Sequence, residues 1–169
     1  MGKGSCAGTG MAEAEALAAE LVRRFTLQGR TFAAAESCTA GLTAALVGRI
    51  PGASRVLWGS YVTYTAEAKK AMLGVGEEII LNHGAVSRET ACAMVGGVLE
   101  RSGADMAVAI TGLAGPGDEP GLSAGTVWIA SARRGGETGA RLFHFPGSRN
   151  EVRLAAAKSA LEELLNLLF

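Results

Sequence analysis

The fold is decided by one stretch of sequence, Thr31-Phe32-Ala33-Ala34-Ala35-Glu36-Ser37-Cys38-Thr39-Ala40-Gly41. Its first part, residues 31–35, is short and largely apolar, as in a strand that is covered on both faces. The polar run at residues 36–39 ends that strand, and a helical pattern follows from Gly41 to Ile50. A strand that passes through a polar loop directly into a helix is typical of α/β proteins.

The same alternation of elements continues along the chain. Apolar spacing predicts helices at residues 11–27, 65–73, 77–82, 87–102 and 151–168, and strands at 56–64, 104–110, 126–132 and 140–145. The connection at residues 133–139 suggests that the last two strands form an antiparallel hairpin. The pattern as a whole predicts a three-layer α/β/α sandwich around a mixed, mainly parallel sheet. We expect a flexible leader at residues 1–10 and a single domain at 11–169.

The amino-acid composition argues against several classes of protein. The chain is 49% hydrophobic and its formal net charge is zero, which argues against disorder and against a basic nucleic-acid surface. The cysteines are few and scattered, without a Cys-x-x-Cys pair, so we expect neither a disulfide framework nor a metal site. No segment has the pattern of a signal peptide or a membrane span. We therefore expect a cytoplasmic protein without a bound metal or cofactor.

Three polar loops are expected at the carboxyl ends of strands, where α/β sheets bind ligands: residues 36–41, 64–69 and 111–117. In the first loop, Ser37 lies between a strand end and a helix start. It could act as a nucleophile, or Ser37 and Thr39 could bind a phosphate together with free amides of the helix start. The alternative interpretation is that Ser37 or Thr39 is only the N-cap of that helix.

A nucleophilic serine requires a base. His144 falls inside a predicted strand and His83 at a helix end, so structural roles are the simpler interpretation for both. Lys69 could serve if burial lowers its pKa. The adjacent Lys70 points about a third of a turn away, so that one lysine could face the cleft and the other solvent. The alternative is that Lys69 is an ordinary surface lysine.

Taken together, these stretches resemble the CinA C-terminal domain family, the nicotinamide-nucleotide amidases. The resemblance extends from about residue 15 to the end of the chain. It rests on motifs in a shared order and spacing: Ala35–Leu42, Val62–Tyr64 with Glu67–Lys69, Leu73–Val75, His83–Ser87, Ala109–Gly117 and Gly125–Val127.

The resemblance implies hydrolysis of the carboxamide of nicotinamide mononucleotide, which yields nicotinate mononucleotide and ammonia in pyridine nucleotide salvage. It also implies a homo-oligomer. By the family pattern Ser37 is the nucleophile, Lys69 its basic partner, and Tyr64 an active-site hydrogen-bonding residue. The residues implied in substrate binding are Cys38, Thr39 and Gly41 of the first loop, Thr111 and Gly112 of the third, and Arg149 as a phosphate contact. The amides of Cys38 or Thr39 could supply an oxyanion site.

The chain departs from the family pattern at three places. Ala40 stands where the family usually has the first of two glycines. Residues 118–124 are shorter than usual and lack a Lys-Pro-Val run, and Ser148 replaces the usual acidic residue before Arg149. Ala40 and the shortened loop motivate an alternative, a nucleotide-binding regulatory module of the same fold that does not turn over. A purely structural oligomerisation domain is a third hypothesis.

Overall fold

The computed structural model describes residues 6–169, with side chains described from Thr9 onward. One sheet has the strand order β2-β1-β3-β4-β5. Its strands are β1 (Phe32–Glu36), β2 (Leu57–Val62), β3 (Met106–Gly112), β4 (Thr126–Arg133) and β5 (Thr138–His144). β1 pairs in parallel with β2 and β3, whereas β4 is antiparallel to both of its neighbours. The prediction of a mixed sheet in which most strands share one direction is confirmed, as is the final hairpin.

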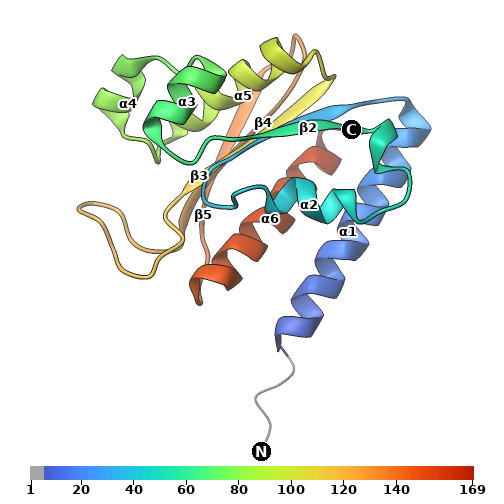
Figure 1. Cartoon of the computed structure of the whole chain (residues 1–169), viewed down its shortest axis with the longest axis horizontal. Helices are drawn as coiled ribbons and strands as arrows, with labels where there is room; N and C mark the ends of the chain where they lie inside the picture. The colour runs from blue at the N-terminus through green and yellow to red at the C-terminus, as the bar shows by residue number, and fades with distance from the viewer. Residues whose placement is uncertain (1–5) are drawn as a thin grey trace, which may run out of the picture.

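Helices cover both faces of this sheet (Figure 1). One face carries α1 (Cys6–Gln28), α2 (Leu42–Gly48) and α6 (Arg149–Asn166), and the other carries α3 (Ala66–Leu73), α4 (Glu77–His83) and α5 (Arg88–Ser102). A short 3-10 helix, Ala53–Arg55, precedes β2. The three-layer α/β/α sandwich predicted from the sequence is therefore confirmed.

The strand β1, which lies between β2 and β3, separates two apolar cores. Phe32 and Ala34 point into the core under α1, α2 and α6, while Ala33 and Ala35 point into the core under α5. This alternation follows from the two-residue period of a strand. Phe32 also packs edge-to-face on Phe25 of α1, with ring centroids 5.4 Å apart, which ties α1 to the sheet.

Capping residues define the ends of several helices. The side chains of Thr65 and Ser87 accept hydrogen bonds from amides in the first turns of α3 and α5. Gly74 and Gly103 end these helices in the left-handed conformation, as residues that follow a helix often do.

The start of the first helix was predicted too late. α1 begins at Cys6 rather than Met11, so residues 6–10 of the expected flexible leader are helical, and residues 1–5 lie outside the described part of the chain. At Gly10 the backbone lies close to Leu154 of α6, and this packing supports a helical start that the local sequence does not signal. Within residues 6–169, no helix combines the length and apolar character that crossing a membrane demands.

Candidate active site

The three loops predicted to converge do so at the carboxyl ends of β1, β2 and β3. They surround a pocket of about 310 Å³, to which the start of α6 also contributes. Seven of the nine residues singled out from the sequence line it: Ser37, Cys38, Tyr64, Lys69, Thr111, Gly112 and Arg149. Thr39 and Gly41 do not line the pocket, so their predicted contact with a substrate is not supported by this geometry.

Ser37 directly follows β1 and is almost fully buried. Its backbone amide donates to the carbonyl of Ile110 in β3 at 3.0 Å, which extends the parallel pairing by one residue and fixes the position of Ser37. Its Oγ lies 2.9 Å from the Nζ atom of Lys69. The hydroxyl thus faces a buried amine at the rim of the sheet.

Lys69 comes from the first turns of α3 and is 1% exposed. Its Nζ also donates to the carbonyl of Thr63 at 2.9 Å. Burial of this amine lowers the pKa of Lys69 to about 8, because desolvation disfavours the charged form. A neutral amine is therefore accessible near physiological pH.

The neighbouring Lys70 behaves differently. It lies at the surface and forms an ion pair with Glu77 at 3.1 Å. One lysine of the pair thus faces the pocket and the other faces solvent, as the helical spacing predicted. The interpretation of Lys69 as a surface lysine is wrong.

The interpretation of Ser37 or Thr39 as a helix cap is also wrong. The N-cap of α2 is Gly41, at φ +91°, and no side chain caps the helix from that position. Before it, residues 37–40 form a turn in which the amide of Ala40 donates to the carbonyl of Ser37 at 3.0 Å. Ala40 has φ +50°, a left-handed conformation that is unfavourable for a residue with a Cβ.

The side chain of Glu36 caps the start of α2 instead, by accepting hydrogen bonds from backbone amides there. Its fully buried carboxylate accepts hydrogen bonds from the amides of Thr43 and Ala44 at 2.9 and 3.0 Å. A third bond comes from the hydroxyl of Ser60 in β2, at 3.0 Å. The sequence suggested that amides at the start of α2 could bind a ligand. In the structure the amides of Thr43 and Ala44 are hydrogen-bonded to Glu36 instead. In the turn before α2, Cys38 lines the pocket and Thr39 is enclosed.

The thiol of Cys38 is not a competing nucleophile in this geometry. Burial raises its pKa to about 11, so the thiolate is scarce at neutral pH. The charge of Lys69 acts in the opposite direction but is outweighed by the desolvation.

Arg149, the first residue of α6, joins two loops across the pocket mouth. Its guanidinium donates to the carbonyl of Gly115 in the third loop and to the hydroxyl of Tyr64 in the second. Within the described residues it has no carboxylate at ion-pair distance. Its positive charge is thus held in place beside a pocket whose lining also includes Glu119.

Thr111, near the end of β3, also lines the pocket. Its hydroxyl donates to the carbonyl of Ala85 at 2.7 Å and so connects the end of β3 to the segment before α5. Gly112 follows it, and a Cβ there would lie 2.7 Å from the carbonyl oxygen of Thr126, so β3 and β4 approach too closely for any other residue.

The two histidines lie elsewhere, as their positions in the sequence suggested. His83 ends α4, with Nδ1 3.8 Å from Glu89, and His144 on β5 lies 3.3 Å from the hydroxyl of Thr126. Neither lines the pocket. Among residues 6–169 no group of three or more His, Cys, Asp and Glu side chains is placed to hold a metal ion.

Arg153 was not predicted from the sequence as a residue near the site. From α6 its guanidinium reaches the turn before α2, where Nε donates to the carbonyl of Cys38 at 3.1 Å and Nη2 to that of Thr39 at 2.9 Å. A signal existed, because Arg153 lies four residues after Arg149 and therefore on the same face of the helix.

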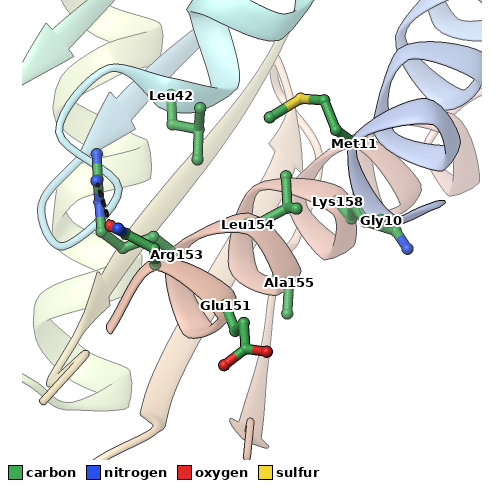
Figure 2. A pocket seen from close by; sticks show the side chains of 9 residues that line it. Gly10, Met11, Leu42, Glu151, Arg153, Leu154, Ala155 and Lys158 are labelled. Carbon is green, nitrogen blue, oxygen red and sulfur yellow. Dashed lines mark hydrogen bonds between the residues drawn. The ribbon is translucent and has the colours of Figure 1, made fainter. Parts of the chain in front are cut away.

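A larger cavity of about 470 Å³ lies beside Arg153, between the start of α1, α2 and α6 (Figure 2). Its lining is mostly apolar and includes Met11, Leu42 and Leu154. It contains no serine, and neither Ser37 nor Lys69 reaches it. The smaller pocket is therefore the candidate active site.

Comparison with known proteins agrees with this architecture. The family model described as the CinA C-terminal domain matches residues 14–168. The chain belongs to the CinA C-terminal domain family. The CinA fold is also seen in the crystal structure of the competence/damage inducible protein CihA from Agrobacterium tumefaciens. That protein is 42% identical, with a TM-score of 0.90 over 93% of this chain and 96% of that one. A CinA superfamily protein from Escherichia coli is 35% identical, with a TM-score of 0.87 over 91% and 90% of the two chains.

Curated relatives of the CinA family are longer. A CinA-like protein of Akkermansia muciniphila is 48% identical over 79% of this chain and 33% of its own length. A putative competence-damage inducible protein of Lacticaseibacillus casei is 41% identical over 90% of this chain and 37% of its own length. The chain thus spans about a third of the length of these curated CinA relatives.

Proposed function

We propose that this CinA domain is a serine amidase that hydrolyses the carboxamide of nicotinamide mononucleotide to nicotinate mononucleotide and ammonia. The observation that carries the proposal is the contact of 2.9 Å between Ser37 Oγ and the buried amine of Lys69. Amide hydrolysis needs a nucleophile, a proton carrier for the departing ammonia and donors for the oxyanion. The pocket presents candidates for all three.

In the acylation step, the neutral amine of Lys69 accepts the hydroxyl proton as Ser37 Oγ attacks the carboxamide carbon. The Thr63 carbonyl holds one N–H of Lys69 and so orients the amine toward Ser37. The tetrahedral intermediate then collapses: its C–N bond breaks, and Lys69 returns the proton to the leaving nitrogen, which departs as ammonia. The product of this step is an ester between Ser37 and the nicotinate carbonyl.

Hydrolysis of that ester repeats the same steps with water as the nucleophile. Lys69 takes a proton from water, the new C–O bond forms, and the proton passes to Ser37 Oγ as the ester bond breaks. The negative charge that develops on the carbonyl oxygen in both steps requires backbone donors. The amide of Cys38 is the candidate, because Cys38 lines the pocket beside Ser37.

Arg149 supports the assignment of a nucleotide as substrate. A guanidinium that is held beside the pocket without an ion-pair partner supplies positive charge and N–H donors for a phosphate group. The identity of the base comes from the family resemblance, since the pocket alone does not distinguish pyridine nucleotides.

The test is an ammonia-release assay with purified protein and nicotinamide mononucleotide, repeated with Ser37→Ala. We expect the variant to lose at least ~10³-fold in kcat, because removal of a nucleophile leaves only binding contributions. Ser159→Ala is the matched control, since it removes a comparably buried serine of α6 that does not line the pocket. Full activity of Ser37→Ala would contradict the serine mechanism.

The strained Ala40 favours a second candidate, a regulatory module that binds the nucleotide without turnover. A ligand that binds only the folded state raises the melting temperature. Protection by nicotinamide mononucleotide without any ammonia after long incubation would support the module. Neither protection nor turnover would support a structural domain.

We also propose that the chain forms a homo-oligomer. β2 is an edge strand, and it exposes 52% of Trp58, whose ring stacks on Tyr61 at 5.8 Å. Exposed apolar groups on an unpaired edge are typical of an interaction surface. Light scattering coupled to gel filtration tests this, with Trp58→Lys expected to shift the mass to that of a monomer.

A further inference from the structure

We propose that Arg153 is a positioning residue of this active site, which holds the turn at residues 37–40 so that the amide of Cys38 serves as the oxyanion donor. The inference rests on the proposed serine mechanism. It concerns a residue that lies outside the pocket lining and reaches the chemistry only through the backbone.

The carbonyl groups of residues 37–39 all accept hydrogen bonds from the protein. The carbonyl of Ser37 accepts from the amide of Ala40 at 3.0 Å, and that of Thr39 accepts from Leu42 at 3.1 Å. Arg153 bonds the carbonyls of Cys38 and Thr39. Three consecutive carbonyl oxygens are thus held by donors of the protein. A carbonyl that turned into the pocket would place negative charge where the oxyanion forms, and Arg153 opposes this.

The turn is strained at Ala40. This residue adopts φ +50°, a left-handed conformation that is unfavourable for a residue with a Cβ. A turn that carries this cost needs contacts that favour it over relaxed alternatives. Hydrogen bonds from a charged donor are stronger than those between neutral groups, and the two bonds from Arg153 to the turn therefore favour its strained conformation.

The guanidinium of Arg153 is planar and presents its donors in a fixed geometry. Two nitrogens of one rigid plane bond two successive carbonyls, which fixes the orientation of both peptide groups. The side chain of Arg153 extends from α6 toward the loop that follows β1, beside the cavity at α1 and α2 (Figure 2). A lysine in its place would offer a point charge without the planar fork.

The test compares Arg153→Met and Arg153→Lys with wild type in two assays. The first assay measures kcat and KM for ammonia release. We expect Arg153→Met to lower kcat by about 10–100-fold with KM within about threefold, as when one oxyanion donor is misplaced. Arg153→Lys should recover part of the loss. Lys158→Met is the control on the same helix, because Lys158 pairs with Glu13 and touches no residue of the turn.

The second assay measures the rate at which a fluorophosphonate labels Ser37, with fluoride as the leaving group. This rate depends on the activated serine and its oxyanion donor but not on the natural substrate. If wild type is labelled but releases no ammonia from the mononucleotide, the assigned substrate is wrong, and the labelling rates still test Arg153. Labelling of Arg153→Met at the wild-type rate, with an unchanged circular dichroism spectrum, would overturn the inference. So would the absence of labelling in wild type.

Discussion

The Nζ atom of Lys69 lies 2.9 Å from the Oγ atom of Ser37, although 32 positions separate the two residues in the sequence. The pairing of β1 with β2 brings them together, because Ser37 follows β1 and Lys69 lies in the helix after β2. The same amine is buried, and the cost of burying its charge makes it a usable base. Most of the expected behaviour of this protein follows from that contact.

Lys69→Met should abolish ammonia release, with a loss of about 10²–10⁴-fold, which is the range for removal of a general base. It should also raise the melting temperature, because a buried amine that resists protonation is replaced by an apolar side chain. Calorimetry and the ammonia assay measure the two effects. Lys70→Met is the matched control: it breaks only a surface ion pair, so activity should be unchanged.

The pH dependence of kcat/KM should report the same amine. Burial lowers the pKa of Lys69 to about 8, so the neutral form becomes more abundant as the pH rises through that value. Activity should therefore increase between about pH 7 and pH 9 and then level off. A profile that falls over this range would mean that protonated Lys69 is the active form.

Arg149→Met should weaken the binding of a substrate that carries a phosphate. We expect KM for nicotinamide mononucleotide to rise about 10–100-fold, since hydrogen bonds to charged groups are worth about 1.5–3 kcal/mol. Nicotinamide riboside, which lacks the phosphate, is the control substrate. If both substrates lose equally, Arg149 supports the pocket through Tyr64 and Gly115 rather than binding phosphate.

Ala40→Gly should stabilise the protein by about 1 kcal/mol, because glycine adopts the left-handed conformation at φ +50° without strain from a Cβ. The midpoint of urea unfolding measures the change. Ala45→Gly is the matched control in α2, where the same substitution should destabilise by roughly 1 kcal/mol. A destabilised Ala40→Gly would show that the turn depends on the methyl group of Ala40.

Much of the site could be predicted from local sequence. The polar run after an apolar strand predicted Ser37 at the rim of the sheet, and the helical spacing of Lys69 and Lys70 allowed one lysine to face the cleft and the other solvent, as the structure has them. The family motifs brought Tyr64, Thr111 and Arg149 to the same place, and all three line the pocket. These features could be predicted because periodicity and motif order are local properties of the chain.

Other features could not be predicted. Thr39 was expected at the substrate, yet it is enclosed, and its hydroxyl finds no partner in the described part of the chain. Glu36 was only a member of a polar run until the structure showed its carboxylate capping α2. The spacing from Arg149 places Arg153 on the same face of α6, but its partners lie 115 and 114 positions away and are not predicted by any local pattern.

The sequence by itself determined the alternation of strands and helices, the loops that carry polar groups and the presence of a serine and a lysine in register with a known family. These depend on side-chain period, capping and motif order, which act over a few residues. Only the tertiary structure decided that Lys69 is buried against Ser37, that Glu36 occupies the start of α2 and that Arg153 holds the strained turn. The reason is that desolvation and long-range hydrogen bonds depend on which segments the fold brings together.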